Sequence, residues 1–396
     1  MKRISLLYFA EKRIMQYRNF QKGALAALTV ALLAGCQKTE ADTAMVEMEK
    51  PSFVSLEEVA QLLSSVPLEA EHLEEVHSAA LSSAGNGYDE EYRMKDLFAA
   101  PGTGVGELAS TKAESWNHPL RDALREALMA TKAGEDASAW LDSLALSDVQ
   151  IYWPYSENWD GHSLPVITFD PGDGALQNEG WTPDGRKVLV DEQMALERPV
   201  WVVNSNTDAV YQSLEMRRRE DPSWGSGGGE LLVKSQAQTE LKTLVLRSFK
   251  ARRQYDGWLS GASEFFVKIG AVENFVASTE AELRLYDPSI TDFMIVVRRK
   301  QVGQEIPFNA VLVSEWSQQL TSCALMIIED DGGTRNSWKC SAMVKVESKS
   351  YGFELELPLH TRDDIVWRGS LTRRYIEKYS GSVQRLGDVD LVFELI

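Results

Sequence analysis

The stretch FELELPL, residues 353–359, carries the clearest structural signal in the chain. Its apolar residues at positions 353, 355, 357 and 359 alternate with Glu354 and Glu356. Successive side chains of a β-strand point to opposite faces of the sheet. The stretch therefore predicts a half-buried strand whose leucines face a core and whose glutamates face water.

Seven other short segments have the same strand-like character, and together they extend the pattern over the C-terminal part of the chain. They are residues 244–249, 264–269, 293–297, 310–313, 324–328, 342–346 and 391–396. Eight short strands over about 160 residues are typical of an antiparallel sandwich. We therefore predict a β-sandwich over residues 233–396.

A turn inside this region predicts how its two cysteines are arranged. Asp331-Gly332 is a two-residue hairpin signal, and a turn centred there places Cys323 directly opposite Cys340. Opposed Cβ atoms lie about 4.5–5.5 Å apart, close to the separation that a disulfide needs. An even number of cysteines in an exported chain favours a Cys323–Cys340 disulfide. The alternative is two buried free thiols.

Upstream of the sandwich the periodicity is helical and then strand-like again. Apolar residues recur at helical spacing in four segments, which predicts a helical module over residues 55–147. Strand patterns at 149–153, 165–169, 187–190 and 199–203 predict a small β region over 148–214, and glycines mark a linker over 215–232. The predicted class is α+β.

The N-terminus has the features of an export signal. A basic region is followed by a short apolar run, residues 24–33, which is too short to span a bilayer. Leu33-Ala34-Gly35-Cys36 then resembles the lipobox of bacterial lipoproteins. We expect a signal peptide over 1–35, acylation of Cys36 and a flexible tether over 36–54. Translation could begin at Met1 or at Met15.

The net charge of the chain limits the classes of partner that it can bind, and the residue after Cys36 bears on its location. The formal net charge is −18, and removing residues 1–35 takes away six basic residues and one acidic residue. Such an acidic chain is unsuited to nucleic acid and is repelled by anionic headgroups, so the lipid would be its link to the membrane. Residue 37 is Gln rather than Asp, which by resemblance to lipoprotein sorting predicts the outer membrane, facing the periplasm or the cell surface.

Acidic loops are the candidates for a cofactor site, and calcium is the cofactor that they suit. Asp170 and Asp173 follow a predicted strand directly and form the first candidate pair. Other acidic residues stand at predicted turns, at Asp256, 329–331 and 363–364. Calcium binds several oxygen ligands from such loops, although turns also favour Asp for backbone reasons. An eight-stranded sandwich with acidic loops resembles C2 domains in outline, without a matching loop motif.

An aromatic stretch offers a second kind of site. Trp153, Tyr155 and Trp159 could stack on a sugar ring, and Glu157 and Asp160 stand among them. Two carboxylates beside such a platform would suit a hydrolase of saccharide or peptide acting in the 148–206 region. Aromatics at this density also build ordinary cores.

Motifs of known catalytic sites are missing from the sequence. His72 and His77 are five residues apart, whereas zinc-binding helices place histidines four apart. A G-x-S-x-G elbow and a phosphate loop are also absent. We therefore assign no catalytic residue.

The layout as a whole resembles uncharacterised Bacteroidetes lipoproteins. The resembling segments are the lipobox, residues 71–96, 152–161 and 255–268. This resemblance supplies no activity. The predicted lipid anchor and β-sandwich, together with the missing catalytic motifs, favour a binding or scaffolding role for an unknown envelope ligand or protein. A hydrolase is the alternative.

Overall fold

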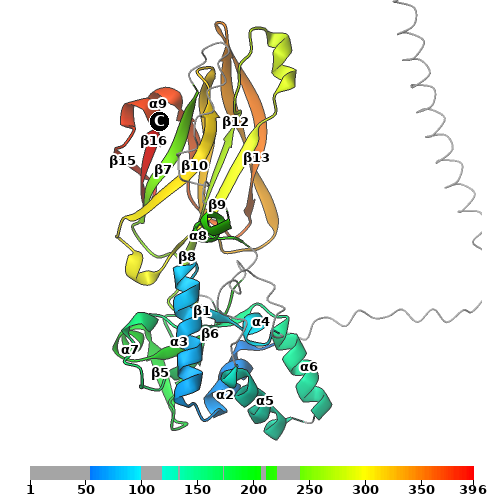
Figure 1. The fold of residues 1–396 in the computed structure, drawn as a ribbon, viewed down its shortest axis with the longest axis vertical. Helices are drawn as coiled ribbons and strands as arrows, with labels where there is room; N and C mark the ends of the chain where they lie inside the picture. Colours follow the sequence, from blue (N-terminus) through cyan, green and yellow to red (C-terminus); the bar gives the residue numbers. More distant parts are fainter. Residues whose placement is uncertain (1–53, 100–117, 133, 173, 207–210, 221–240) are drawn as a thin grey trace, which may run out of the picture. The chain divides into compact units, whose positions relative to one another are not determined.

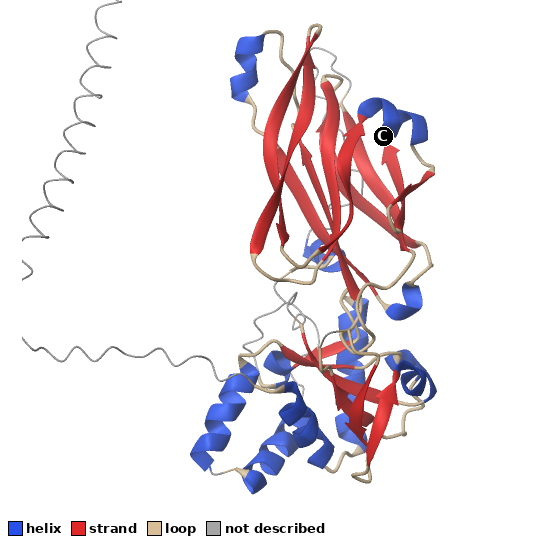
Figure 2. Cartoon of the chain, turned by 180° about the vertical axis from the view of Figure 1, so that it is seen from behind, coloured by secondary structure: helices blue, strands red, loops and turns tan. Residues whose placement is uncertain are grey.

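The computed structural model describes residues 54–99, 118–132, 134–172, 174–206, 211–220 and 241–396. The predicted signal peptide, Cys36 and all of the tether before Val54 lie outside these residues. None of the described helices combines the length and the apolar character that crossing a membrane requires. The described residues belong to one compact unit. Within it we distinguish an α/β part (54–206) and a sandwich (241–396), shown in Figure 1 and Figure 2.

The α/β part is built on a six-stranded sheet with the order β1-β2-β6-β3-β4-β5. Strands β3 and β6 run parallel, and the other neighbouring pairs run antiparallel. The strands are β1 (Glu91–Arg93), β2 (Val149–Tyr152), β3 (Val166–Phe169), β4 (Gln177–Trp181), β5 (Lys187–Asp191) and β6 (Val200–Ser205).

The helices of this part bury their apolar stripes in one core with the sheet. Leu63, Leu73 and Leu124 of three helices share that core with Ile151 and Trp201 of the sheet. The helices are α2 (Leu56–Ser65), α3 (Ala70–Gly85), α4 (Met94–Leu97), α5 (Pro119–Thr131), α6 (Gly134–Ala145) and α7 (Glu192–Glu197). The predicted boundary at residue 147 therefore divides a single α/β part, because its two sides share a core and β1 pairs with β2 across it.

The C-terminal part is a β-sandwich, as predicted. One sheet has the order β10-β7-β16-β15, and the other has the order β13-β12-β11-β8-β9, with β14 paired to β11. Aromatic and aliphatic side chains of both sheets form its core, including Phe249, Phe393, Phe265 and Ile327. The predicted strand at 353–359 is confirmed: Leu357 is fully buried, while Glu354 and Glu356 are exposed.

Most strands of the sandwich are longer than the sequence pattern indicates. They are β7 (Lys242–Ala251), β8 (Ser263–Ala271), β9 (Ser289–Val297), β10 (Ile306–Trp316), β11 (Leu320–Glu329), β12 (Arg335–Val346), β13 (Lys349–His360), β14 (Asp364–Thr372), α9 (Arg373–Tyr379), β15 (Val383–Leu386) and β16 (Val389–Leu395). The predicted linker also begins as a helix, α8 (Leu214–Glu220), whose Leu214 is buried in the sandwich core. Residues 221–232 of that linker lie outside the described part.

The predicted pairing of the two cysteines is wrong. Strands β11 and β12 pair at Ser322 with Met343, so a tight turn at Asp331-Gly332 does not set their register. Cys323 instead lies opposite Leu371 of β14, and Cys340 lies opposite Leu355 of β13. Each thiol points at the carbonyl oxygen of that neighbouring residue, and both are free. The predicted disulfide is therefore not formed in this structure.

A loop between β7 and β8, residues 252–262, joins the sandwich to the α/β part. Trp258 and Leu259 of this loop are buried in a core cluster with Val166 and Val202 of the six-stranded sheet. The indole nitrogen of Trp258 donates a hydrogen bond to the carbonyl of Leu176 at 2.8 Å. Strands β7 and β8 hold the two ends of the loop, and Trp258 and Leu259 anchor its middle to the α/β part. Asp256 lies between these fixed points.

Candidate metal centre

The topology of the sandwich brings acidic residues from separate segments to one end of strand β11. This strand pairs with β8 on one side and with β14 on the other. Glu329, the last residue of β11, therefore lies opposite Phe265 of β8 and Asp364 of β14. Asp331 follows in the next loop, and Asp256 comes from the loop before β8.

Five carboxylates form a group that we call the carboxylate site: Asp256, Glu264, Glu329, Asp331 and Asp364. Oxygens of Asp256, Glu264 and Glu329 lie within 4.8 Å of one another, and so do oxygens of Glu329, Asp331 and Asp364. Calcium–oxygen distances are about 2.3–2.6 Å, so two ligand oxygens on one ion are at most about 5 Å apart. Each group of three can therefore contact a single cation, and Glu329 belongs to both.

Glu329 is the buried centre of this site. Its exposed fraction is 0%, and neither of its carboxylate oxygens has a hydrogen-bond partner among the described residues. Burial, reinforced by the carboxyl groups of Asp256 and Asp331, raises the pKa of Glu329 to about 11. A buried anion without a donor or a countercharge costs several kcal/mol. The side chain must therefore hold a proton or face a cation.

The neighbouring carboxyls experience the same crowding. Burial raises the pKa of Asp256, and one of its oxygens is also buried without a hydrogen-bond partner among the described residues. Burial and the charge of Asp256 raise the pKa of Asp331 to about 6. Arg299 donates to the backbone carbonyl of Asp256 at 2.9 Å, but it also pairs with Glu192 at 3.3 Å. The arginine therefore offsets only part of the negative charge.

The sequence predicts this acidic end in part. Asp256, residues 329–331 and residues 363–364 are predicted as acidic loops, and the fold brings Asp256, Glu329, Asp331 and Asp364 together. The first predicted calcium pair is not among them. Asp170 accepts hydrogen bonds from the amide of Gly172 and the hydroxyl of Ser260, at 2.8 and 2.9 Å. Asp173 lies outside the described residues.

Glu264 is the member of the site that the sequence analysis missed. It stands in a predicted strand rather than in a loop, and nothing in the local pattern distinguishes it from any solvent-facing strand residue. Its place at the start of β8, beside the end of β11, depends on the antiparallel pairing of the two strands. Only the register of the sheet identifies it as a neighbour of Glu329.

The predicted aromatic platform is not formed. Trp153 is 1% exposed and packs edge-on against Trp201 in the core of the α/β part. Trp159 is half-buried beside it, whereas Tyr155 packs against a different core cluster and donates its hydroxyl to Glu192. A buried Trp153 cannot stack on a sugar, so these three residues serve the core.

The carboxylates beside those aromatics are also engaged elsewhere. Glu157 forms an ion pair with Lys300 at 2.7 Å, and Lys300 also contacts the buried Glu90 at 3.3 Å. Asp160 accepts a hydrogen bond from the hydroxyl of Ser163 and two more from the amides of Ser163 and His162, which together lower its pKa to about 2.

In comparisons with known proteins, no family model, no curated protein and no solved structure matches this chain.

Proposed function

We propose that this protein is a calcium-dependent binding protein of the bacterial cell envelope, anchored by lipid on Cys36, with calcium bound at the carboxylate site. The observation that carries the cation is Glu329, a fully buried carboxylate surrounded by other carboxylates, whose two oxygens have no hydrogen-bond partner among the residues that the structure describes. The address rests on the signal-peptide pattern and the lipobox at residues 33–36.

The chemistry of the donors favours calcium over other common cations. The site offers carboxylate oxygens alone, which suit hard cations and not the softer metals that thiolates select. Calcium takes six to eight oxygens in flexible geometry and accepts bidentate carboxylates. Magnesium usually keeps several waters and uses only one or two carboxylates. A crowded group with the buried Glu329 at its centre therefore matches calcium best.

The exposed side of the site suggests how a bound ion would serve binding. Asp331 and Asp364 are both exposed, in contrast to Glu329. A calcium ion held between them would keep coordination positions open towards solvent. Anionic oxygens of an envelope component could occupy those positions, although the site itself is strongly negative without the ion. We therefore expect the ligand to be an anionic molecule that binds only in the presence of calcium.

A hydrolase remains the alternative that the sequence suggests. Glu157 is paired with Lys300 and Asp160 closes a turn, so neither is placed as a catalytic carboxyl.

Thermal unfolding of the purified protein tests the cation. Extracellular calcium modules bind with dissociation constants of about 10⁻⁴–10⁻³ M, so at a hundredfold excess calcium should stabilise the fold by about 2.7 kcal/mol. We expect 10 mM calcium to raise the Tm by several degrees, magnesium to do much less, and a chelator to reverse the effect.

Two matched variants locate the effect. Glu329→Gln keeps the shape of the side chain but removes its charge, and it should abolish the calcium-induced shift. Glu354→Gln changes an exposed glutamate of β13 and should leave the shift intact. An equal shift in the wild type and in Glu329→Gln would refute a calcium ion at this site.

A further inference from the structure

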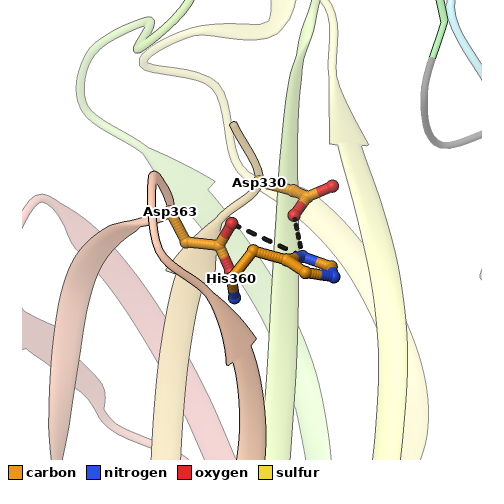
Figure 3. A group of neighbouring side chains, drawn as sticks. All are labelled: Asp330, His360 and Asp363. Atoms are coloured by element: carbon orange, nitrogen blue, oxygen red, sulfur yellow. Dashed lines mark hydrogen bonds and ion pairs between the residues drawn. The ribbon is translucent and has the colours of Figure 1, made fainter. Parts of the chain in front are cut away.

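A second group of side chains that could hold a metal ion lies on neighbouring loops and is separate from the carboxylate site. It consists of Asp330, His360 and Asp363, which point towards one another in Figure 3. The imidazole Nδ1 of His360 lies 3.0 Å from an oxygen of Asp330 and 3.7 Å from an oxygen of Asp363. Asp330 follows the end of β11, His360 ends β13, and Asp363 lies in the turn before β14.

The alternation of side chains along the chain separates the two groups. Successive residues of an extended strand point to opposite faces. Glu329 and Asp364 belong to the carboxylate site, whereas their chain neighbours Asp330 and Asp363 belong to the second group. One pair of strand ends therefore supplies ligands to two sites.

Burial and charge at the second group call for a cation. The side chains of Asp330 and Asp363 are 5% and 0% exposed, and the imidazole of His360 is 25% exposed. One oxygen of Asp363 accepts a hydrogen bond from the amide of His360 at 2.6 Å, which fixes the carboxylate. Its other oxygen is buried and has no hydrogen-bond partner among the described residues. Two buried carboxylates thus converge on one ring nitrogen.

The spacing of the three ligand atoms matches tetrahedral coordination. Zinc binds histidine nitrogen and carboxylate oxygen at about 2.0–2.2 Å, so ligand atoms at neighbouring corners of a tetrahedron lie about 3.3–3.5 Å apart. The two distances from Nδ1, 3.0 and 3.7 Å, bracket this value. Calcium is a poorer match because it prefers oxygen donors to imidazole.

From this geometry we propose that Asp330, His360 and Asp363 bind a zinc ion, or another divalent first-row cation that favours mixed nitrogen and oxygen ligands. The ion would sit between Nδ1 and the two carboxylates and would take its fourth ligand from water. It would tie the end of β11 to the turn between β13 and β14. This site is independent of the proposed calcium function.

Charge distinguishes this proposal from a simple ion pair. Two carboxylates and a neutral imidazole carry a net charge of −2, which one divalent cation balances.

Calorimetric titration with zinc tests the proposal on the full-length protein, first stripped with a chelator and then supplied with excess calcium. We expect one zinc site that calcium does not displace. His360→Ala should weaken zinc binding by about a hundredfold or more, since it removes a direct ligand. Cobalt in place of zinc should give the strong visible absorption of a tetrahedral complex in the wild type only.

Matched variants keep the test decisive. His162 also contacts an aspartate, Asp160, but its side chain is 80% exposed, so His162→Ala is the control for adventitious binding and should leave the affinity unchanged. Glu329→Gln should abolish calcium binding while sparing zinc. Should His360→Ala fail to fold, Asp363→Asn replaces it. Absence of zinc binding, equal affinity in His360→Ala or Asp363→Asn, or loss only in His162→Ala would overturn the proposal.

Discussion

At the scale of single residues, the carboxylate site depends on burial rather than on the number of acids. Acidic side chains are common at turns, and Asp331 and Asp364 alone would be ordinary solvated residues. Glu329 differs because both of its oxygens are buried without a hydrogen-bond donor among the described residues. The sequence predicts acidic loops at 256, 329–331 and 363–364, but it cannot predict which of their carboxylates is buried. That follows from the pairing of β11 with β8 and β14.

The two cysteines give a first prediction at this scale. Cys323 is fully buried, and burial raises its pKa well above the ordinary value, so its thiolate is scarce and shielded. Cys340 is half-buried. In the native protein we expect a thiol-reactive reagent to label Cys340 slowly and Cys323 hardly at all, with both labelled after unfolding. Peptide mass spectrometry measures the labelling, and a reductant should leave the Tm unchanged. A drop in Tm with reductant would indicate a disulfide instead.

At the scale of elements, strongly alternating strands are predictable and weakly patterned ones are not. The strand at 353–359 is found with its correct faces because its leucines and glutamates alternate without interruption. Strand β14 (Asp364–Thr372) is missed because most of its residues are exposed or half-buried and its apolar residues do not alternate. Strand β4 (Gln177–Trp181) is also missed, because it is short and mostly polar.

The connection between β11 and β12 shows why the pairing register of a strand is harder to predict than the presence of the strand. Residues 330–334 separate the two strands, and Gly332 and Gly333 both adopt positive φ angles, of 66° and 104°. A longer connection of this kind does not impose the pairing that a two-residue turn would. The predicted opposition of Cys323 and Cys340 assumed a hairpin, and it fails because β14, not β12, pairs with β11 at Cys323 and beyond.

Substitutions on two neighbouring residues of β13 test the inferred faces of this strand. Leu357 is fully buried, so Leu357→Ala should lower the free energy of unfolding by about 2–5 kcal/mol. Glu356 is exposed and pairs with Lys339 at 3.6 Å, so Glu356→Ala should cost far less stability than Leu357→Ala. Chemical denaturation measures both. Equal costs for the two variants would contradict the assignment of the faces.

At the scale of the whole molecule, buried polar groups hold the α/β part and the sandwich together. Asp89 accepts a hydrogen bond from the amide of Ala262 at 2.9 Å. Asn204 donates to the carbonyls of Leu259 and Ser260 at 3.1 and 2.8 Å. These contacts join residues far apart in the sequence, so no local pattern predicts them, and the sequence analysis treats the parts as separate modules.

Three buried carboxyl groups in the same region, at residues 89–91, should make the stability of the fold depend on pH. Burial is the main cause that raises the pKa of Asp89, Glu90 and Glu91 to about 6, 8 and 7, despite the nearby charges of Arg93 and Lys300. The folded protein therefore retains protons that the unfolded chain releases near pH 4. Their stabilising contribution is fully present below about pH 4 and is lost as the pH rises through 6 to 8.

Thermal unfolding in chelator from pH 5 to 9 measures this dependence. We expect the Tm of the wild type to fall over that range and Glu91→Gln to reduce the slope, because the amide does not ionise. Glu354→Gln, which changes an exposed glutamate, is the control and should follow the wild type. A Glu91→Gln variant with an unchanged slope would show that the proton on this carboxyl does not contribute.

The proposed anchor gives a further prediction for the molecule as a whole. Acyl chains on Cys36 would hold the protein to the membrane, because its net charge, −18 for the full sequence and more negative without residues 1–35, opposes binding to anionic headgroups. Cys36→Ala should therefore move the protein from the membrane fraction to the soluble fraction of fractionated cells. Cys340→Ala should stay with the membrane, and a Cys36→Ala protein that also stays there would refute the anchor.

The central claim is that Glu329 marks a calcium site at the end of the sandwich, and calorimetric titration of chelator-treated protein with calcium tests it most directly. The account predicts saturable binding at a stoichiometry of at least one ion per chain, loss of that binding in Glu329→Gln, and normal binding in Glu354→Gln. Absence of calcium binding to the wild type, or binding of equal affinity in Glu329→Gln, would contradict it.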